Sequence, residues 1–170
     1  VAKYWNCKRV VGVVTEALEC HGGNGFIEDG PMARLYREAP LNGIWEGSGN
    51  IIALDVARAL ARTPETAGAF LDEVRRARGG DRRLDEVTRR LEAELAAPGE
   101  HEARARHITE RLALCLQASL IVQHSPSAVA DAFCATRLAG DGAVAFGCLP
   151  SGLDRRAIVE RARMADDADA

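Results

Sequence analysis

The 170-residue sequence has few aromatic residues and no long hydrophobic run. Aromatic side chains make up only 5% of the chain, and no apolar run approaches the roughly 20 residues that cross a membrane as a helix. We therefore expect no membrane partner and no signal peptide. No segment rich in β-branched residues competes with helix formation. The expected fold class is therefore all-α.

Cysteine usage and net charge exclude further kinds of site. The five cysteines are odd in number and widely spaced, and they form neither a CxxC pair nor a zinc-binding pattern: Cys7, Cys20, Cys115, Cys134 and Cys148. They favour reduced thiols in a cytoplasmic protein, and we expect no metal site. A net charge of -3 and a pI near 5.8 give no overall attraction to nucleic acid or to an anionic membrane.

The sequence is instead rich in helix-forming residues. It is 47% hydrophobic and 28% charged, and alanine, leucine, arginine and glutamate recur in runs. Glycine, proline and capping residues separate these runs, and Asp81 can cap the helix that follows it. The pattern predicts helices near residues 1–20, 31–38, 51–61, 64–78, 82–97, 101–124, 127–138 and 154–164, with a glycine-rich loop over 21–30. Apolar stripes are expected at Val10, Val11, Val14 and Leu18, at Leu84, Val87, Leu91 and Leu95, and at Ile108, Leu112, Cys115, Leu116 and Leu120.

The segment IWEGSGN at 44–50 places one carboxylate, Glu46, directly before a Gly-Ser-Gly turn. Gly47 and Gly49 permit backbone angles and close approaches that a side chain would block, and the serine or asparagine of the motif can cap the following helix. A helix N-terminus offers unpaired N–H groups that suit a phosphate, a ribose or a developing oxyanion. The plainer interpretation is a surface glutamate before a capped helix.

Two motifs in this part of the chain resemble the C-terminal segment of the acyl-CoA dehydrogenases. GGNGF stands at 22–26, and the Glu46 motif follows about twenty residues later. The sequence RLYRE at 34–38, which leads into the Glu46 motif, is most similar to the alkylation-response, or AidB-type, branch of that family. The resemblance is close over about 4–62 and looser to about 138.

The resemblance implies an oxidoreductase that binds FAD and oxidises an acyl-CoA thioester. In such enzymes a glutamate removes the proton alpha to the thioester carbonyl, while a hydride leaves the beta carbon for the flavin. Glu46 stands at that position, its backbone N–H would bind the thioester oxygen, and Gly47 would lie against the substrate. The positions that match FAD contacts are Ser48 and Asn50 and, toward the FAD of a neighbouring subunit, Gly22, Gly23 and Asn24. A homo-oligomer is therefore expected.

The resemblance also divides the chain. Residues 1–62 correspond to part of the helical bundle that ends an acyl-CoA dehydrogenase, and residues 63–170 correspond to additional C-terminal helices of the AidB type. Domains that bind flavin and substrate precede this segment in the family. We therefore expect the chain to be a fragment that holds no FAD and is inactive alone, with an apolar helix face that another copy or a rearranged fold must cover.

The alternative function is association with duplex DNA, which has been ascribed to the extra helices of AidB-type proteins. Between residues 75 and 90, seven arginines accompany three acidic residues, a local charge of +4. The candidate contacts are Arg58, Arg75, Arg76, Arg78, Arg82 and Arg83. Such binding would be weak, independent of base sequence and steeply dependent on salt.

Two plainer interpretations remain. The arginines could form a solvated helix face with ion pairs such as Glu86–Arg90 and Asp85–Arg89. The whole chain could also be a helical oligomerisation segment with no independent function. The sequence does not specify the acyl chain length.

Overall fold

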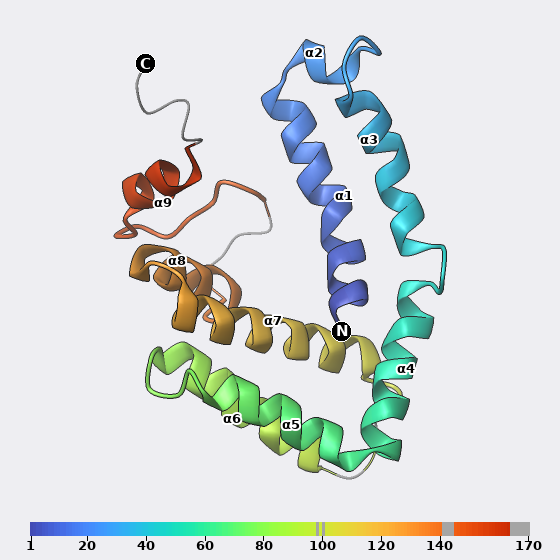
Figure 1. The fold of residues 1–170 in the computed structure, drawn as a ribbon, viewed down its shortest axis with the longest axis vertical. Helices are drawn as coiled ribbons and strands as arrows, with labels where there is room; N and C mark the ends of the chain where they lie inside the picture. Colours follow the sequence, from blue (N-terminus) through green and yellow to red (C-terminus); the bar gives the residue numbers. More distant parts are fainter. Residues whose placement is uncertain (98, 100, 141–144, 164–170) are drawn as a thin grey trace. The chain divides into compact units, whose positions relative to one another are not determined.

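The structure is a computed structural model that describes residues 1–97, 99, 101–140 and 145–163. Helices account for its regular structure, and these residues contain no strand, so the expected all-α fold is confirmed. In chain order the elements are α1 (Ala2–Cys20), α2 (Gly23–Phe26), α3 (Met32–Glu38), the 3-10 helix η1 (Ala39–Gly43), α4 (Gly49–Arg62), α5 (Pro64–Arg75), α6 (Arg82–Ala96), α7 (Ala105–His124), α8 (Ser127–Arg137) and α9 (Arg155–Ala162), as drawn in Figure 1.

The helices form two compact units. One comprises residues 1–68 and 95–113, and the other comprises residues 69–94 and 114–170. Helices α5, α6 and α7 therefore each contribute residues to both units. The predicted division after residue 62 follows sequence resemblance and stays a prediction. Within the described part of the chain, no helix combines the length and the apolar character needed to cross a membrane.

The first unit is organised around α1, which contacts α2, α3, η1 and α4. Figure 1 shows α1 running beside α3, with α2 beyond its C-terminal end. Tyr4 of α1 is only 5% exposed and packs in a small core with Ala53 and Ala105. This core holds the start of α1 against α4, which is the arrangement that positions the Glu46 motif.

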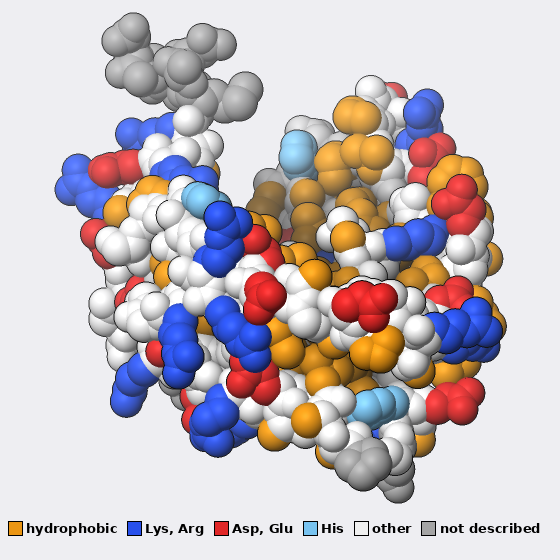
Figure 2. All heavy atoms as spheres, turned by 60° about the horizontal axis from the view of Figure 1, so that its bottom comes forward, with side chains coloured by type: hydrophobic (Ala, Val, Ile, Leu, Met, Phe, Trp, Pro, Cys, Tyr) orange, Lys and Arg blue, Asp and Glu red, His pale blue; other side chains and the backbone are white. Residues whose placement is uncertain are grey.

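The predicted apolar stripe of α1 is only partly buried. Val10, Val11, Val14 and Leu18 are all of intermediate exposure. Many large apolar side chains of the first unit are exposed, and apolar groups are visible at the surface in Figure 2. They are Val13, Phe26, Ile27, Leu35, Tyr36, Leu41, Ile44, Trp45 and Ile51. The first unit therefore presents an extensive apolar surface.

The second unit buries three of the four residues of the stripe that the sequence predicted on α6; the fourth, Leu95, is half-buried and belongs to the first unit. Leu84, Val87 and Leu91 are each at most 4% exposed. Helix α7 is tied to α5 by Ser119, whose buried hydroxyl donates to the Val74 carbonyl at 3.2 Å. The prediction that Leu120 points inward is wrong, because the helix register places Ser119 inside and leaves Leu120 40% exposed.

Three predicted boundaries need correction. Helix α5 ends at Arg75 and not near residue 78, because the N–H groups of residues 76–78 donate to carbonyls three residues earlier. The glycine-rich loop over 21–30 contains one helical turn, α2, because the N–H of Ile27 donates to the carbonyl of Gly23. The long helix begins at Ala105 and not at residue 101, because the preceding residues form shorter-range turn bonds such as Ala105 N–H to the Glu102 carbonyl.

Helix α6 begins with the cap that its sequence predicts. The Asp81 carboxylate accepts hydrogen bonds from the backbone N–H groups of Arg83 and Leu84, at 2.8 and 3.4 Å. The Arg83 guanidinium binds the same carboxylate and also reaches Asp131 of α8 at 2.7 Å. This cluster joins the start of α6 to α8.

All five cysteines are free thiols, as expected. Cys134 is fully buried beside the Asp81 cluster. Burial is the main cause that raises the pKa of the Cys134 thiol to about 12. This thiol therefore stays protonated at neutral pH, which makes it unreactive.

The Asp81 cluster predicts a stability that depends on pH. Burial opposes ionisation of Asp81, but the hydrogen bonds from Arg83 outweigh it and lower the Asp81 pKa. A lowered folded-state pKa stabilises the protein above the unfolded value of about 3.9 and stops doing so as the pH falls through the folded value. Asp81→Asn keeps the cap but loses the charge, so its free energy of unfolding should fall by about 1–2 kcal/mol at pH 7. Urea unfolding should show this difference shrinking below about pH 4. A difference that is equal at pH 7 and pH 3 would contradict the charge pairing.

Candidate functional site

The Glu46 motif is a sharp bend between η1 and α4. The Leu41 carbonyl accepts hydrogen bonds from the N–H groups of Ile44 and Trp45, at 2.9 and 3.1 Å, and these bonds end η1. Glu46 then adopts a φ of 54° and Gly47 a φ of 108°. Glu46 is the one non-glycine residue with positive φ in the described ranges. This conformation is unfavourable for a side chain as long as glutamate, and such strain often accompanies function.

Lys3 of α1 holds the bend. Its ammonium group donates to the Trp45 carbonyl at 3.0 Å and lies 3.7 Å from Oε2 of Glu46. The Glu46 side chain is 77% exposed, and Trp45 is 55% exposed. A base that removes a weakly acidic proton needs a site from which water is excluded. The described residues therefore supply the carboxylate and its backbone but leave it open to solvent.

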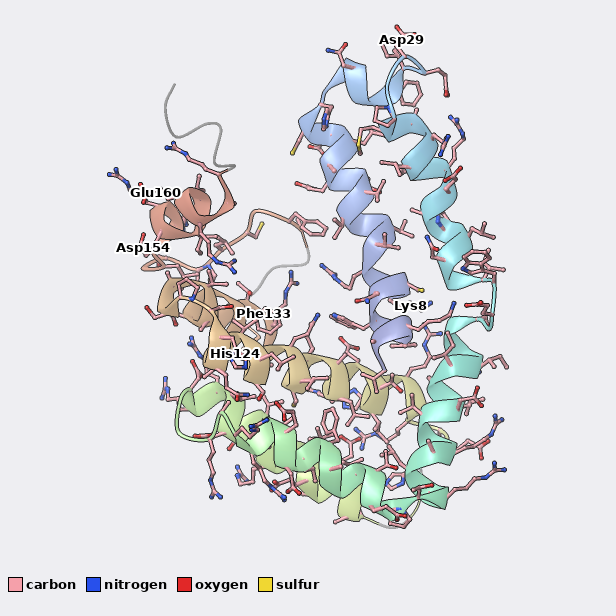
Figure 3. The ribbon with its side chains drawn as sticks, viewed as in Figure 1. Lys8, Asp29, His124, Phe133, Asp154 and Glu160 are labelled. Atoms are coloured by element: carbon pink, nitrogen blue, oxygen red, sulfur yellow. The ribbon has the colours of Figure 1, made fainter. Side chains whose placement is uncertain are left out.

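Helix α4 starts directly after the bend. Ser48 stands at the N-cap, but its side chain makes no capping hydrogen bond, and the helix starts with the backbone bond from Ile52 N–H to the Ser48 carbonyl. The predicted side-chain cap is therefore not made. Ser48 and Asn50 are exposed. Lys8 of α1, labelled in Figure 3, lies against Gly49, where an added Cβ would meet its Cε at 2.6 Å.

These residues fit one side of an FAD site. The N–H groups of Glu46 and Gly47 have no acceptor among the described residues, and the Ser48 hydroxyl is not used by the helix. A phosphate or a ribityl hydroxyl needs donors of this kind, and a helix N-terminus adds a partial positive charge. When bound, FAD would accept a hydride; the contacts that hold it here would come from Ser48, Asn50 and the free N–H groups.

The three glycines of GGNGF are used in three different ways. Gly22 needs its freedom because its φ is 57° and its ψ is -142°. Gly23 has ordinary dihedral angles, and a Cβ there would meet nothing within 4 Å. Gly25 is buried, and a Cβ there would overlap the Leu18 carbonyl oxygen. Gly23 is therefore the position open to an external group, and Gly25 is fixed by packing, which the sequence did not indicate.

The glycine turn and the Glu46 bend lie at opposite ends of α1. Gly22 follows the C-terminal end of this helix, whereas Lys3 holds the bend at its N-terminal end. A helix of 19 residues is roughly 28 Å long. The structure therefore does not bring the predicted cofactor contacts Gly22, Gly23 and Asn24 together with Ser48 and Asn50 within one copy. The His21 ring beside the turn contacts the Ala17 carbonyl, one of the last carbonyls of α1, at 2.8 Å.

The arginines of α3 form ion pairs with residues that are not their neighbours in the sequence. Arg37 binds both carboxylate oxygens of Glu28, and Arg34 pairs with Glu38 at 3.4 Å. The hydrogen bond from Arg37 lowers the pKa of Glu28. The reason is helical spacing, since residues four apart share a face and neighbours do not. An apolar hollow of about 520 Å³, lined in part by Leu18, Phe26 and Tyr36, lies beside this pair.

The arginine-rich segment is largely neutralised. Five of its seven arginines make ion pairs: Arg75 with Asp72 and Glu92, Arg76 with Glu73, Arg83 with Asp81 and Asp131, and Arg89 and Arg90 with Glu86. Arg58 of α4 pairs with Asp55. The expected Glu86–Arg90 pair is confirmed. The prediction of an Asp85–Arg89 pair is wrong, because the Asp85 carboxylate instead accepts a hydrogen bond from the Gly79 backbone N–H.

The charge that remains on this surface is small. Residues 72–92 contain seven arginines and six carboxylates, a net charge of +1, against +4 for the narrower stretch considered in the sequence. On the face drawn in Figure 2, basic and acidic side chains are intermixed. Arg78 and Arg82 have no ion pair among the residues that the structure describes, and both line a hollow of about 330 Å³ between α5 and α6. Within the described part of this segment, these two arginines are the positive charges that no carboxylate neutralises.

The described residues contain no cluster of histidine, cysteine and carboxylate that could hold a metal ion.

Lys3 belongs to the candidate site, although the sequence did not indicate it. No motif links a lysine in the first turn of α1 to a bend more than forty residues later, so the contact could not be predicted from the sequence.

The sequence of this chain is similar to the sequences of known proteins. The acyl-CoA dehydrogenase C-terminal domain matches residues 1–61. The chain is 38% identical over 143 residues to a protein of Escherichia coli (strain K12) named "Putative acyl-CoA dehydrogenase AidB", covering 84% of this chain and 26% of that protein. It is 30% identical over 151 residues to acyl-CoA dehydrogenase family member 11 of Caenorhabditis elegans, covering 77% of this chain and 24% of that protein.

A third similar protein is the cyclohexane-1-carbonyl-CoA dehydrogenase of Syntrophus aciditrophicus (strain SB), 35% identical over 60 residues, or 35% of this chain and 16% of that protein. The two longer matches extend beyond the 61 residues of the family domain, so the sequence similarity to those two relatives continues into the later part of the chain. The chain spans about a quarter of the length of each of them. The chain belongs to the acyl-CoA dehydrogenase family and is an AidB-like form of its C-terminal segment.

Proposed function

We propose that this chain acts as part of a longer FAD-dependent acyl-CoA dehydrogenase, in which Glu46 is the catalytic base. The observation that carries the proposal is the bend itself. Glu46 is held in a left-handed conformation with its own N–H unpaired, immediately before the N-terminus of α4. Strain of this kind persists where the surrounding structure fixes it, and here η1, Lys3 and α4 do so.

Each residue of the bend has a role in this chemistry. The Glu46 carboxylate takes the proton alpha to the thioester carbonyl, and the electron pair left behind moves toward the carbonyl oxygen. The Glu46 N–H donates to that oxygen, and this hydrogen bond strengthens as negative charge develops. Gly47 lies against the acyl chain, where a side chain would collide with it. FAD supplies the acceptor for the hydride that leaves the beta carbon.

The separation of the two cofactor motifs favours a homo-oligomer. Ser48 and Asn50, which would contact FAD, lie at one end of α1, and Gly22, Gly23 and Asn24 lie at the other end, roughly 28 Å away. In the proposal, the glycine turn reaches the FAD held by a second copy. The exposed apolar residues of the first unit, such as Phe26 and Trp45, would be covered by the rest of the protein and by that copy.

The test uses the full-length protein with bound FAD. Addition of acyl-CoA thioesters of increasing chain length without oxygen should bleach the flavin absorbance for at least one of them, and the enoyl-CoA product should appear in equal amount. A full-length protein that holds FAD but shows no bleaching with any thioester would exclude this function.

The alternative function, binding of duplex DNA, would rest on Arg78 and Arg82. These arginines are exposed, unlike Arg83, and they have no ion pair in the part of the chain that the structure describes. The remaining candidates, Arg58, Arg75, Arg76 and Arg83, are paired and would have to exchange a carboxylate for a phosphate.

Replacing both Arg78 and Arg82 with glutamine should weaken any binding to a fluorescent duplex and reduce the slope of log K against log salt by about 2, one for each phosphate contact. The matched control, Arg75→Gln with Arg76→Gln, removes two paired arginines and should change the slope less. Fluorescence anisotropy at several salt concentrations measures both. Binding that does not depend on salt would exclude the arginines as its cause.

A further inference from the structure

Lys3 is the residue that joins the first turn of α1 to the Glu46 bend, 42 residues later. Its ammonium group makes two contacts there, a 3.0 Å hydrogen bond to the Trp45 carbonyl and a 3.7 Å ion pair with Glu46. The two contacts differ in how strongly they constrain the bend. The ion pair is long and its carboxylate is 77% exposed, so it contributes little to stability. The bond to the carbonyl has the usual length of a hydrogen bond, 3.0 Å, and a charged donor, so it constrains the backbone.

That constraint acts on the peptide unit between Trp45 and Glu46. A peptide is planar and trans, so its C=O and N–H bonds point in opposite directions. Lys3 draws the Trp45 carbonyl toward α1, and the Glu46 N–H is therefore directed away from α1. This N–H has no acceptor among the described residues. The adjoining peptide is fixed separately, because the Trp45 N–H donates to the Leu41 carbonyl.

The bend could otherwise adopt another conformation. Glu46 has a positive φ, which is unfavourable for glutamate, and Gly47 beside it places little restriction on a rotation of this peptide. A rotated peptide would present a carbonyl oxygen where the thioester oxygen needs a donor. Lys3 is the hydrogen-bond donor to the Trp45 carbonyl in the described structure. Its bond therefore opposes this rotation.

We propose that Lys3 is a positioning residue for thioester oxidation: by binding the Trp45 carbonyl, it fixes the Glu46 N–H in the orientation that receives the thioester oxygen. The inference rests on the proposed function, because it gives this N–H its catalytic purpose. Lys3 does not contact the substrate. It acts on the negative charge that develops on the oxygen through the peptide that it holds, so its effect belongs to the chemical step and not to substrate binding.

The kinetic test compares three variants of the full-length flavoprotein. Lys3→Met removes the donor and keeps the length of the side chain. Removal of one oxyanion donor lowers kcat by about 10²–10³. In Lys3→Met the donor is present but poorly oriented, so kcat should fall by about 10- to 100-fold, with KM changed less than about threefold. Lys3→Arg keeps a charged donor and should recover part of the rate. Arg34→Met is the control, because it also removes a positive charge and an exposed ion pair, with Glu38, and should leave kcat within about twofold.

A second measurement does not need activity. NMR spectroscopy of the 170-residue chain labelled with ¹³C and ¹⁵N follows the peptide directly. The chemical shift of the Trp45 carbonyl carbon should change in Lys3→Met and return in Lys3→Arg. The Glu46 and Gly47 amide signals should broaden in Lys3→Met as the peptide rotates. Unchanged signals, an equal loss of rate in Arg34→Met, or a raised KM with an unchanged kcat would each overturn the proposal. A full-length flavoprotein that oxidises no thioester would instead remove the proposed function, while the spectra would still decide whether Lys3 holds the peptide.

Discussion

Glu46→Gln should lower kcat for thioester oxidation by about 10³-fold in the full-length flavoprotein, within the 10²- to 10⁴-fold range typical of a lost general base. Glutamine has nearly the same shape as glutamate and keeps the backbone N–H that binds the thioester oxygen. It cannot accept the alpha proton. The substrate should therefore still bind, and flavin reduction should become slow. Stopped-flow absorbance of the flavin, followed without oxygen, measures this step directly.

The matched control is Glu38→Gln. Glu38 is also an exposed glutamate of the first unit with a basic partner, Arg34, but it lies on α3 away from the bend. This variant should keep the wild-type rate of flavin reduction. If Glu46→Gln reduced the flavin as fast as the wild type, Glu46 would not be the base. If it lost FAD, Glu46 would have a structural role in the cofactor site.

Gly25→Ala should destabilise the chain by about 2 kcal/mol, although alanine is the better helix former. Alanine in a helix is favoured over glycine by about 1 kcal/mol. Against this, the new methyl group would overlap the Leu18 carbonyl oxygen and approach His21 Cβ to 3.0 Å. Forcing a methyl into a packed site costs about 1–3 kcal/mol, and here the closest atom is backbone, so the upper end applies. Urea unfolding followed by circular dichroism measures the difference.

Gly23→Ala separates packing from cofactor binding. Gly23 has ordinary dihedral angles and no atom within 4 Å of the added methyl, so the free energy of unfolding of this chain should change by less than about 0.5 kcal/mol. In the full-length protein, the proposed function expects the same methyl to weaken FAD binding from the neighbouring subunit. An equal loss of stability in both glycine variants would show that the whole turn is structural.

The sequence predicted local features well where neighbouring residues decide them. The cap of α6 by Asp81 is such a feature, because the acceptor and the N–H groups that it binds lie within three residues. The stripe of Leu84, Val87 and Leu91 is another, since helical spacing alone places these side chains on one face. Predictions that needed a partner from another element did less well. Asp85 was expected to pair along the helix with Arg89 but instead receives the Gly79 N–H.

The candidate site shows the same division. Two motifs and their order were enough to predict the family and to select Glu46, because short glycine-flanked patterns are recognisable in a linear sequence. Tertiary structure alone decided three other features of the site. Lys3 binds the Trp45 carbonyl, and α1 separates the two cofactor motifs. Packing requires glycine at Gly25 but leaves Gly23 open. Each depends on which atoms of distant residues meet when α1 packs against its neighbours. Periodicity and local spacing carry no record of such distances.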